Sequence, residues 1–306
     1  MRLKGSGMKQ ICGIFGYTRQ GYYKHLKIQS ERAIRDEEVL KVVKLIRLRQ
    51  AKIGGKKLHK MIQPDIKIGR DYLFSLLQSQ GLLVKTKRKF TKTTISGSLK
   101  VKHPNLIKHA ELTHTNQAWV VDITFINTCN GFVYLYLVTD LYSRKIIAHH
   151  VADNLHAKTA CIALKAALTT TKTPKDIIHH SDQGIQYMSK QYQDILQSNS
   201  MLCSTTGKDH CYDNAVAERV NGILKQEFGL SQTMPSLKVA REMADEAVSI
   251  YNNERIHASL GYQTPASMYI NGLQDYPHGG HSIYVGDGVA KCKKCHATTI
   301  PEEKHV

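Results

Sequence analysis

The sequence lacks the features that would assign it to a membrane or a secreted class of protein. No apolar run approaches the ~18 residues that a transmembrane helix needs, and this excludes a membrane-spanning segment. The N-terminal stretch MRLKGSGMKQ is broken by glycine and by charge, which is not the pattern of a signal peptide. The seven cysteines are odd in number and scattered along the chain, so they predict no disulfide framework. We therefore expect a cytosolic protein.

Acidic residues are scarce in the first third of the chain. Residues 1–110 contain 26 Lys and Arg but 6 Asp and Glu, whereas residues 111–306 contain 17 and 19. The formal net charge of +18 thus divides into +20 and −2. A basic surface can simply aid solubility, but it also binds polyanions, of which nucleic acid is the commonest in a cytosol. The asymmetry favours one part that binds DNA and another part with a different task.

Short helices with glycine and proline breaks are predicted through residue 84. Residues 8–26 read as two short helices broken near Gly16, with Thr18 as an N-cap, which is the length of a helix-turn-helix. Apolar spacing predicts further helices over 31–51, 58–63 and 69–80. We expect a basic all-α DNA-binding module over residues 1–84. A polar, basic linker follows over residues 85–111, and its cluster of Lys85, Lys87, Arg88 and Lys89 is predicted to lie along DNA.

Beyond the linker the pattern changes to alternating strands and helices. Asn130-Gly131 predicts a hairpin turn between the first two strands. Runs rich in β-branched and aromatic residues predict strands over 118–126, 132–141, 145–151, 176–181 and 201–206. Helices are predicted over 156–170, 188–198, 214–228 and 237–252. This order predicts an α/β fold in which an antiparallel hairpin opens a sheet whose later strands are parallel.

Three carboxylates occupy unusual positions in this pattern. Asp122 lies in the middle of an apolar strand, and an acidic residue there is costly unless it is paired or binds metal. Asp182 lies at the carboxyl end of a strand, where open α/β sheets place their ligands. Glu218 lies in the first turns of a helix. Any one of them could be a cap or a surface charge, but together they suit two Mg²⁺ ions for phosphodiester chemistry.

The helix that carries Glu218 has a polar face. Lys225 lies seven residues on, nearly on the same face, and Asn221 lies between the two. The opposite face is apolar and is expected to pack on the sheet. Nearby acidic residues have structural explanations, since Asp140 ends a strand, and Glu227 lies on the far side of the helix. No His-Glu-x-x-His motif and no phosphate-binding glycine loop offers a competing site.

With these residues, the chain resembles the second-reading-frame product of the IS-three class of bacterial insertion sequences, transposases of the DDE retroviral-integrase superfamily. The spacing between Asp182 and Glu218, with 35 residues between them, and the basic residue seven positions after the glutamate are typical of that family. The resemblance runs from about residue 8 to 271. The stretches that carry it are WVVDITFI (119–126), HHSDQGIQY (179–187), STTGKDHCYDNAVAERVNGILKQE (204–227) and YNNERIHASLGYQTPASM (251–268).

The resemblance implies a ribonuclease H-like integrase catalytic core over residues 112–275, with a mixed five-stranded sheet and flanking helices. It implies Mg²⁺-dependent DNA cleavage and strand transfer at the element's ends, with two ions and with Mn²⁺ able to substitute. In this mechanism Asp122 would bridge both ions, while Asp182 and Glu218 would each hold one. The same resemblance suggests DNA contacts for Lys225, Asn214, Asn221, Arg255 and His257, although the last two could instead support the core.

The resemblance also implies partners. These are the terminal inverted repeats, target DNA, further copies of the chain on DNA, and the first-reading-frame product, as a fusion or as a separate subunit. The expected location is the bacterial cytoplasm, with the nucleoid as the site of action. An alternative is a non-catalytic fragment that binds DNA or a partner and regulates transposition.

Residues 276–306 are expected to form a tail outside the core. Cys292 and Cys295 form a C-x-x-C motif followed by His296, and His278 and His281 could complete a zinc knuckle. The spacing is irregular and supplies half a motif. A disordered tail is therefore the favoured interpretation.

Overall fold

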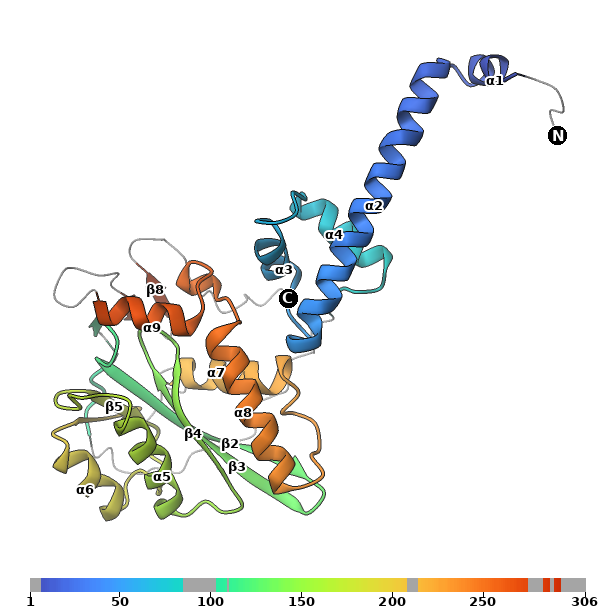
Figure 1. The fold of residues 1–306 in the computed structure, drawn as a ribbon. Coiled ribbons are helices and arrows are strands. Elements are labelled where there is room, and N and C mark those ends of the chain that lie inside the picture. Colours follow the sequence, from blue (N-terminus) through green and yellow to red (C-terminus); the bar gives the residue numbers. More distant parts are fainter. Residues whose placement is uncertain are drawn as a thin grey trace. The chain divides into compact units, whose positions relative to one another are not determined.

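The computed structural model describes residues 7–84, 103–108, 110–207, 214–274, 283–286 and 289–292. The chain divides into two compact units, Met1–Lys85 and Thr86–Val306 (Figure 1). The linker residues Lys85, Lys87, Arg88 and Lys89 lie outside the described residues, so their contact with DNA stays a prediction. Among the described helices, none combines the length and the apolar character that crossing a membrane requires.

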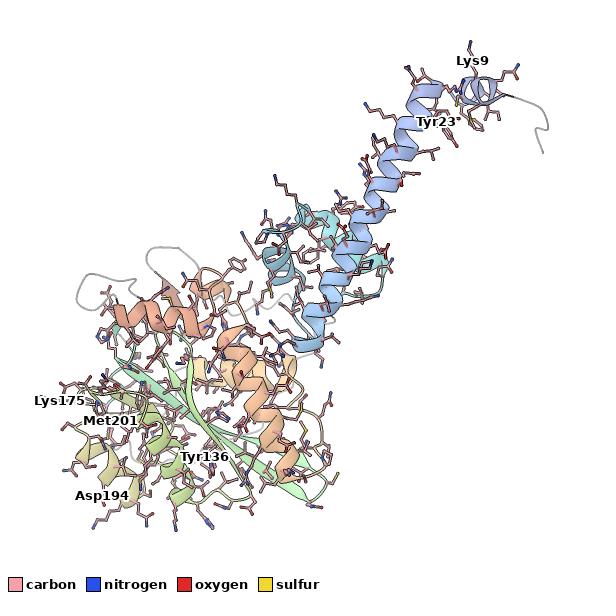
Figure 2. All side chains as sticks on the ribbon, viewed as in Figure 1. Lys9, Tyr23, Tyr136, Lys175, Asp194 and Met201 are labelled. Carbon is pink, nitrogen blue, oxygen red and sulfur yellow. The ribbon has the colours of Figure 1, made fainter. Side chains whose placement is uncertain are left out.

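The first unit is all α-helical, as predicted. Its helices are α1 (Met8–Ile14), α2 (Arg19–Arg49), α3 (Gly55–Ile62) and α4 (Arg70–Ser79). Thr18 caps α2, because its hydroxyl accepts a hydrogen bond from the backbone of Gly21. The C-terminal half of α2 packs on α3 and α4 through a small core that includes Val39, Val43 and Leu73. At the other end of α2, Tyr23 lies on the helix surface, half exposed (Figure 2).

The lengths of the first helices differ from the prediction. The short helix expected to end at residue 26 and the one expected over 31–51 are a single 31-residue helix, α2. The intervening KIQSE contains neither proline nor glycine, so nothing in it stops a helix. Lys27 and Glu31, one turn apart, face each other at 4.0 Å and favour the continuous helix.

The second unit is built on a mixed five-stranded sheet, as predicted. Its strands are β2 (Ala118–Thr128), β3 (Gly131–Asp140), β4 (Ile146–Ala152), β5 (Ile178–Ser181) and β6 (Leu202–Thr205), in the spatial order β4-β3-β2-β5-β6. The first three strands are antiparallel, whereas β5 and β6 run parallel to β2. The hairpin turns at Cys129-Asn130, one residue before the predicted Asn130-Gly131, because Gly131 already pairs with Thr128. Gly131 has φ +110°, which a side chain would strain.

Helices cover both faces of this sheet. The helices α5 (Ala157–Leu168) and α6 (Lys190–Ser198) pack on one face, where Trp119 and Tyr136 are fully buried (Figure 2). The helices α7 (Ala215–Glu227) and α8 (Leu237–Asn253) pack on the other face against Ile126 and Leu135. As expected, the apolar face of α7, with Val220 and its neighbours, packs on the sheet.

Short elements that the sequence did not reveal complete the unit. The 3-10 turn η1 (Ala258–Leu260) and the helix α9 (Pro265–Gln274) follow α8. The strand β1 (Glu111–Leu112) pairs with β7 (Ile283–Gly286), which pairs with β8 (Val289–Cys292), in a second small sheet. The strands β7 and β8 lie within residues 276–306, and the expectation of a disordered tail for the rest of that segment stays a prediction. The side chains of Cys292, Cys295 and the histidines proposed for zinc lie outside the described residues, so that site is untested.

Candidate active site

The acidic site forms where strand β2 extends beyond its neighbour. β5 pairs with β2 only from Ala118 to Val120, so β2 extends past β5 until Met234 bridges to Thr128 near its far end. Asp122 lies two residues beyond the last pair, and Asp182 directly follows β5. Because parallel strands end on the same edge, both carboxylates reach one point of the sheet. The sequence prediction that these two aspartates converge is therefore confirmed by the geometry.

The carboxylate of Asp122 is held but not neutralised. One oxygen accepts the backbone N–H of Ile123 at 2.9 Å, and the other accepts the side-chain amide of Asn221 at 2.6 Å. Loss of hydration and, after it, the negative charges of Asp182 and Glu218 together raise the pKa of Asp122 to about 7, against the opposing effect of these two hydrogen bonds. Repulsion between carboxylates at one site is relieved by a bound cation.

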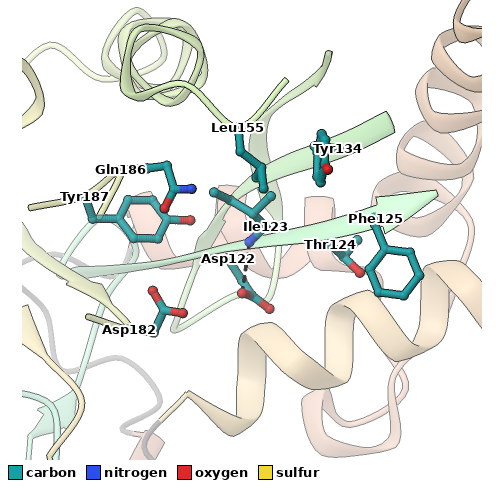
Figure 3. A pocket seen from close by; sticks show the side chains of 9 residues that line it. All are labelled: Asp122, Ile123, Thr124, Phe125, Tyr134, Leu155, Asp182, Gln186 and Tyr187. Carbon is teal, nitrogen blue, oxygen red and sulfur yellow. Dashed lines mark hydrogen bonds between the residues drawn. The ribbon is translucent and has the colours of Figure 1, made fainter. Parts of the chain in front are cut away.

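Asp182 faces the same hollow from a tight turn. Its Oδ1 accepts the backbone N–H of Gly184 at 2.9 Å, and burial raises its pKa. A Cβ atom on Gly184 would lie 2.9 Å from that oxygen and 3.1 Å from Gln186 Oε1, so a side chain at this position would displace the Asp182 carboxylate. The pocket has a volume of about 230 Å³ (Figure 3). It is lined by Asp122, Ile123, Thr124, Phe125, Tyr134, Leu155, Asp182, Gln186 and Tyr187.

Helix α7 brings the third carboxylate towards this pair. Glu218 lies in the first turn of α7 and does not line the pocket, but its charge acts on Asp122. Within the described part of the chain, no three His, Cys, Asp or Glu side chains are gathered closely enough to hold a metal ion. The structure thus brings Asp122 and Asp182 together in one pocket. Glu218, the third predicted ligand, lies outside the pocket but near enough for its charge to raise the pKa of Asp122.

The two asparagines predicted to contact DNA support the site from within. Asn221 is buried, and its amide holds Asp122. Asn214, also buried, donates its amide to the backbone oxygen of Val121 at 3.3 Å and so ties the start of α7 to β2. These contacts fix the distance between Glu218 on α7 and Asp122 on β2. Contact of either asparagine with DNA stays a prediction.

Lys225 lies on the last turn of α7, on the side of the acidic site. Its Nζ is 4.0 Å from the centre of the Phe125 ring, a cation–π contact. Burial lowers its pKa, an effect that the charge of Asp122 partly offsets. No described carboxylate forms an ion pair with it, so the ammonium is free to bind a phosphate near the pocket.

Arg255 and His257 lie in the interior. The guanidinium of Arg255, which is 2% exposed, donates two hydrogen bonds of 2.7 Å to the Glu227 carboxylate and one of 2.8 Å to His257 Nε2. His257 packs edge-on against Tyr251 at 5.1 Å. This network joins α7, α8 and the chain after α8, and it favours the core-supporting interpretation. DNA binding by either residue stays a prediction.

Two residues of the pocket wall were not singled out from the sequence. Tyr187 is buried, and burial together with the nearby aspartates raises its pKa well above the usual value. Behind it, Tyr192 contacts His179 through a 2.9 Å hydrogen bond. Phe125 is the other, and it stands three residues after Asp122 with half of its surface exposed. An exposed phenylalanine beside a strand aspartate is a signal that only the solvent exposure reveals.

The donor set fits divalent metal ions. Carboxylate oxygens are the ligands that Mg²⁺ prefers. Here the charges of Asp182 and Glu218 act on Asp122, and the charge of Asp122 in turn acts on Lys225. A hollow of about 230 Å³ holds several waters of ~30 Å³ each, which such ions retain.

Family models place this site in a known class of domain. One model described as "Integrase core domain" matches residues 113–211, and a second with the same description matches residues 199–265. Together they span all three carboxylates. The first covers β2 and Asp182, and the second covers Glu218 and α7.

Similar proteins extend the match over most of the chain. The "Insertion element IS600 uncharacterized 31 kDa protein" of Shigella sonnei is 32% identical over 266 residues, with 84% of this chain and 97% of that protein aligned. The "Transposase InsF for insertion sequence IS3A" of Escherichia coli K12 is 28% identical over 270 residues, covering 84% and 92%. The "Transposase for insertion sequence element IS629" of Shigella sonnei is 27% identical over 268 residues, covering 85% and 90%.

Solved structures with the same type of core are more distant. The HTLV-2 integrase catalytic core domain in complex with magnesium aligns with a TM-score of 0.40 at 18% identity, over 50% of this chain and 96% of that one. The integrase of the simian T-cell lymphotropic virus intasome aligns with a TM-score of 0.44 at 16% identity, over 71% and 70%. From the family models and the relatives, the chain belongs to the IS3 family of bacterial insertion-sequence transposases, which carry an integrase core domain.

Proposed function

We propose that this protein is a transposase that cuts and joins DNA at the ends of its insertion sequence with two Mg²⁺ ions. One observation carries the proposal: two aspartates from neighbouring parallel strands line one pocket, where burial, together with the charges of Asp182 and Glu218, raises the pKa of Asp122 to about 7. Asp122 would contact both ions, while Asp182 and Glu218 would each hold one. Mn²⁺ is expected to substitute for Mg²⁺. Bound there, such ions stabilise the attacking and the leaving oxygen of a phosphodiester.

The side chains of the chain itself position the substrate. Asn221 orients Asp122, and the backbone of Gly184 orients Asp182, so neither carboxylate needs to reorganise when DNA binds. Lys225 is free to bind the phosphate next to the scissile bond. Water would attack first and release a 3′-hydroxyl at the end of the element. That hydroxyl would then attack a second phosphodiester, which inserts the element into target DNA.

The partners follow from this reaction. The basic region of residues 1–110, with its formal balance of +20, would bind the terminal inverted repeats or the target. Two DNA ends must meet for strand transfer, so we expect several copies of the chain on DNA. The first-reading-frame product would join as a fusion or as a partner. The reaction would take place in the bacterial cytoplasm, on the nucleoid.

The alternative is a non-catalytic fragment that binds DNA and regulates transposition. It predicts DNA binding without cleavage. The held carboxylates argue against it, because Asn221 and Gly184 maintain a geometry that DNA binding alone does not require.

The test uses labelled duplexes that carry the two ends of the element encoding this chain, with and without Mg²⁺. We expect the full chain, alone or fused to its first frame, to cut and join them only with Mg²⁺. Asp182→Asn should bind the duplexes equally but make neither product. Asp194→Asn, on the exposed surface of α6, is the matched control and should behave as wild type. Joining by Asp182→Asn would overturn the assignment, and binding without cleavage by wild type would favour the regulatory alternative.

A further inference from the structure

Two phenylalanines stand exposed beside the acidic pocket. Phe125 on β2 is 52% exposed, and Phe132 on β3 is 59% exposed. Their ring centres are 5.3 Å apart, and their planes are tilted by 74°, an edge-to-face pair. The register pairs Phe125 with Tyr134, which places Phe132 diagonally next to it on the same face of the hairpin. We name these two residues the aromatic platform. Apolar rings that remain in water beside a polar pocket mark a binding surface.

The aromatic platform is continuous with the acidic site. Phe125 lines the same pocket as Asp122 and Asp182, and in Figure 3 its ring points away from the carboxylates on the far side of Thr124. Leu155 and Tyr134 extend the apolar wall. The pocket thus has an anionic wall that suits metal ions and an apolar wall that suits neither ions nor phosphate.

A cation occupies one face of the aromatic platform. Nζ of Lys225 lies 4.0 Å from the ring centre of Phe125, and no described carboxylate pairs with it. A cation–π contact at a half-exposed ring is worth little, so a phosphate would readily draw the ammonium away. The ring face that Lys225 leaves is then open to a flat ligand.

We propose that the aromatic platform stacks an unpaired nucleobase of the nucleotide whose phosphate Lys225 binds. The inference rests on the proposed function and adds a feature of its substrate, a base taken out of the helix at the cleavage point. A nucleotide carries an anion and a flat ring a short distance apart, and the platform presents a cation and a flat ring in the same arrangement. A second protein would place apolar side chains against the anionic wall, whereas a nucleotide places its phosphate and the metal ions there.

Stacking has an energetic purpose. Unstacking and unpairing a base costs a few kcal/mol, and base–aromatic stacking, which tolerates any sequence, returns an amount of similar size. When the base is held outside the duplex, its phosphodiester can enter the pocket at the edge of the sheet. A fully paired and stacked duplex would contact only the outer surface of that pocket.

The test is a double-mutant cycle between protein and DNA. The probe is a forked duplex with one unpaired base at the cleavage position, against the same duplex with an abasic site there. Both are bound to the full chain carrying Asp182→Asn, so that no cleavage intervenes. Replacing Phe125 by leucine keeps an apolar side chain but removes the ring. We expect Phe125→Leu to weaken binding of the fork with the base by roughly 5- to 150-fold and to leave the abasic fork unchanged.

A spectroscopic signal supplies an independent readout. With 2-aminopurine as the unpaired base, stacking on the ring should quench fluorescence at saturating protein, and Phe125→Leu should restore it. Phe132→Leu should act in the same direction with a smaller effect. Phe15→Leu is the matched control, because Phe15 is 68% exposed in the first unit, and it should leave the quenching at saturation unchanged.

The outcomes are separable. Equal weakening of both forks by Phe125→Leu, or unchanged quenching, would overturn the stacking inference. A change in oligomeric state instead would assign the platform to a protein contact and would also overturn it. Both substituted positions are more than half exposed, so the variants are expected to fold, which circular dichroism checks. If the wild-type protein shows no Mg²⁺-dependent cleavage, the proposed function is refuted. The binding measurements with Asp182→Asn would still test the stacking inference separately.

Discussion

Two aspartates of the β2–β3 hairpin, Asp140 and Asp122, are both buried but have different surroundings. Asp140, at the end of β3, is fully buried and fully satisfied. It accepts the backbone N–H groups of Asn116 at 2.8 Å and Ser143 at 2.7 Å and the Ser143 hydroxyl, and the charge of Arg144 stands nearby. Burial raises its pKa, and each of these neighbours opposes the rise.

Asp122 receives the opposite treatment. It has two hydrogen bonds, from Ile123 and Asn221, but the charges that act on its pKa are those of Asp182 and Glu218, and Lys225 is near enough to feel its charge. A buried carboxylate with a complete set of hydrogen-bond and charge partners is compatible with a stable fold. A buried carboxylate beside other carboxylates is repelled by them, and a bound cation relieves that repulsion. The comparison teaches that partners, and not burial, separate a structural carboxylate from a functional one.

The largest expected effect is on catalysis, and it follows from substitution of Asp122. Asp122→Asn removes a metal ligand, and loss of several kcal/mol of transition-state stabilisation lowers the rate of strand cleavage on the order of 10³-fold or more. The measurement is the single-turnover rate on end-containing duplexes with Mg²⁺. Thermal unfolding of the same variant should show unchanged or raised stability, because the repulsion from Asp182 is gone. Wild-type rates in this variant would contradict the assignment.

The second effect is on stability, and it follows from substitution of Asp140. Asp140→Ala leaves the guanidinium of Arg144 buried without its nearby negative charge, and this costs about 3–5 kcal/mol of unfolding free energy. Urea unfolding measures it. Asp245→Ala, at an exposed aspartate that pairs with His149, is the control and should change stability by less than about 1 kcal/mol. Equal losses for the two substitutions would show that Asp140 is not a structural centre.

A smaller effect concerns pH. The pKa of Asp122 is about 7 in the metal-free fold, above its usual value of 3.8, so the folded protein binds this proton more tightly than the unfolded chain does. This proton binding adds to the free energy of unfolding. The added stability is fully present below pH 3.8 and is lost as the pH rises towards 7, by up to ~1.4 kcal/mol per pH unit. Asp122→Asn should remove this part of the pH dependence when unfolding is followed in chelator. An identical pH profile for the variant and the wild type would contradict the raised pKa.

Much of the core could be predicted from the sequence because its signals are local. Alternating apolar residues and the Asn130-Gly131 turn predicted the strands of the sheet, and the position of Asp182 after β5 predicted the convergence with Asp122. The length of α2 could not be predicted, since a polar stretch without a breaker reads equally as a loop or as a helix. The strands β1, β7 and β8 are too short to have a pattern, and their pairing is long-range.

The supporting contacts of the site were also beyond the sequence. That Asn221 shares a helix face with Glu218 was predictable, but its hydrogen bond to Asp122 depends on how α7 packs across β2. The exposure of Phe125 depends on which elements pack on β2 beyond Val120, where its pairing with β5 stops. Such features follow from tertiary packing, which periodicity does not encode.

The central claim is that the carboxylates around Asp122 need a cation and that Asp140 does not. Mg²⁺ titration followed by thermal unfolding tests it most directly, on wild type, Asp122→Asn and Asp140→Asn. We expect Mg²⁺ at a hundred times its dissociation constant to stabilise the wild type by ~2.7 kcal/mol. Asp140→Asn should gain the same amount, from a lower starting stability, and Asp122→Asn should gain little or nothing. An equal gain in Asp122→Asn, or none in the wild type, would contradict a cation site at Asp122.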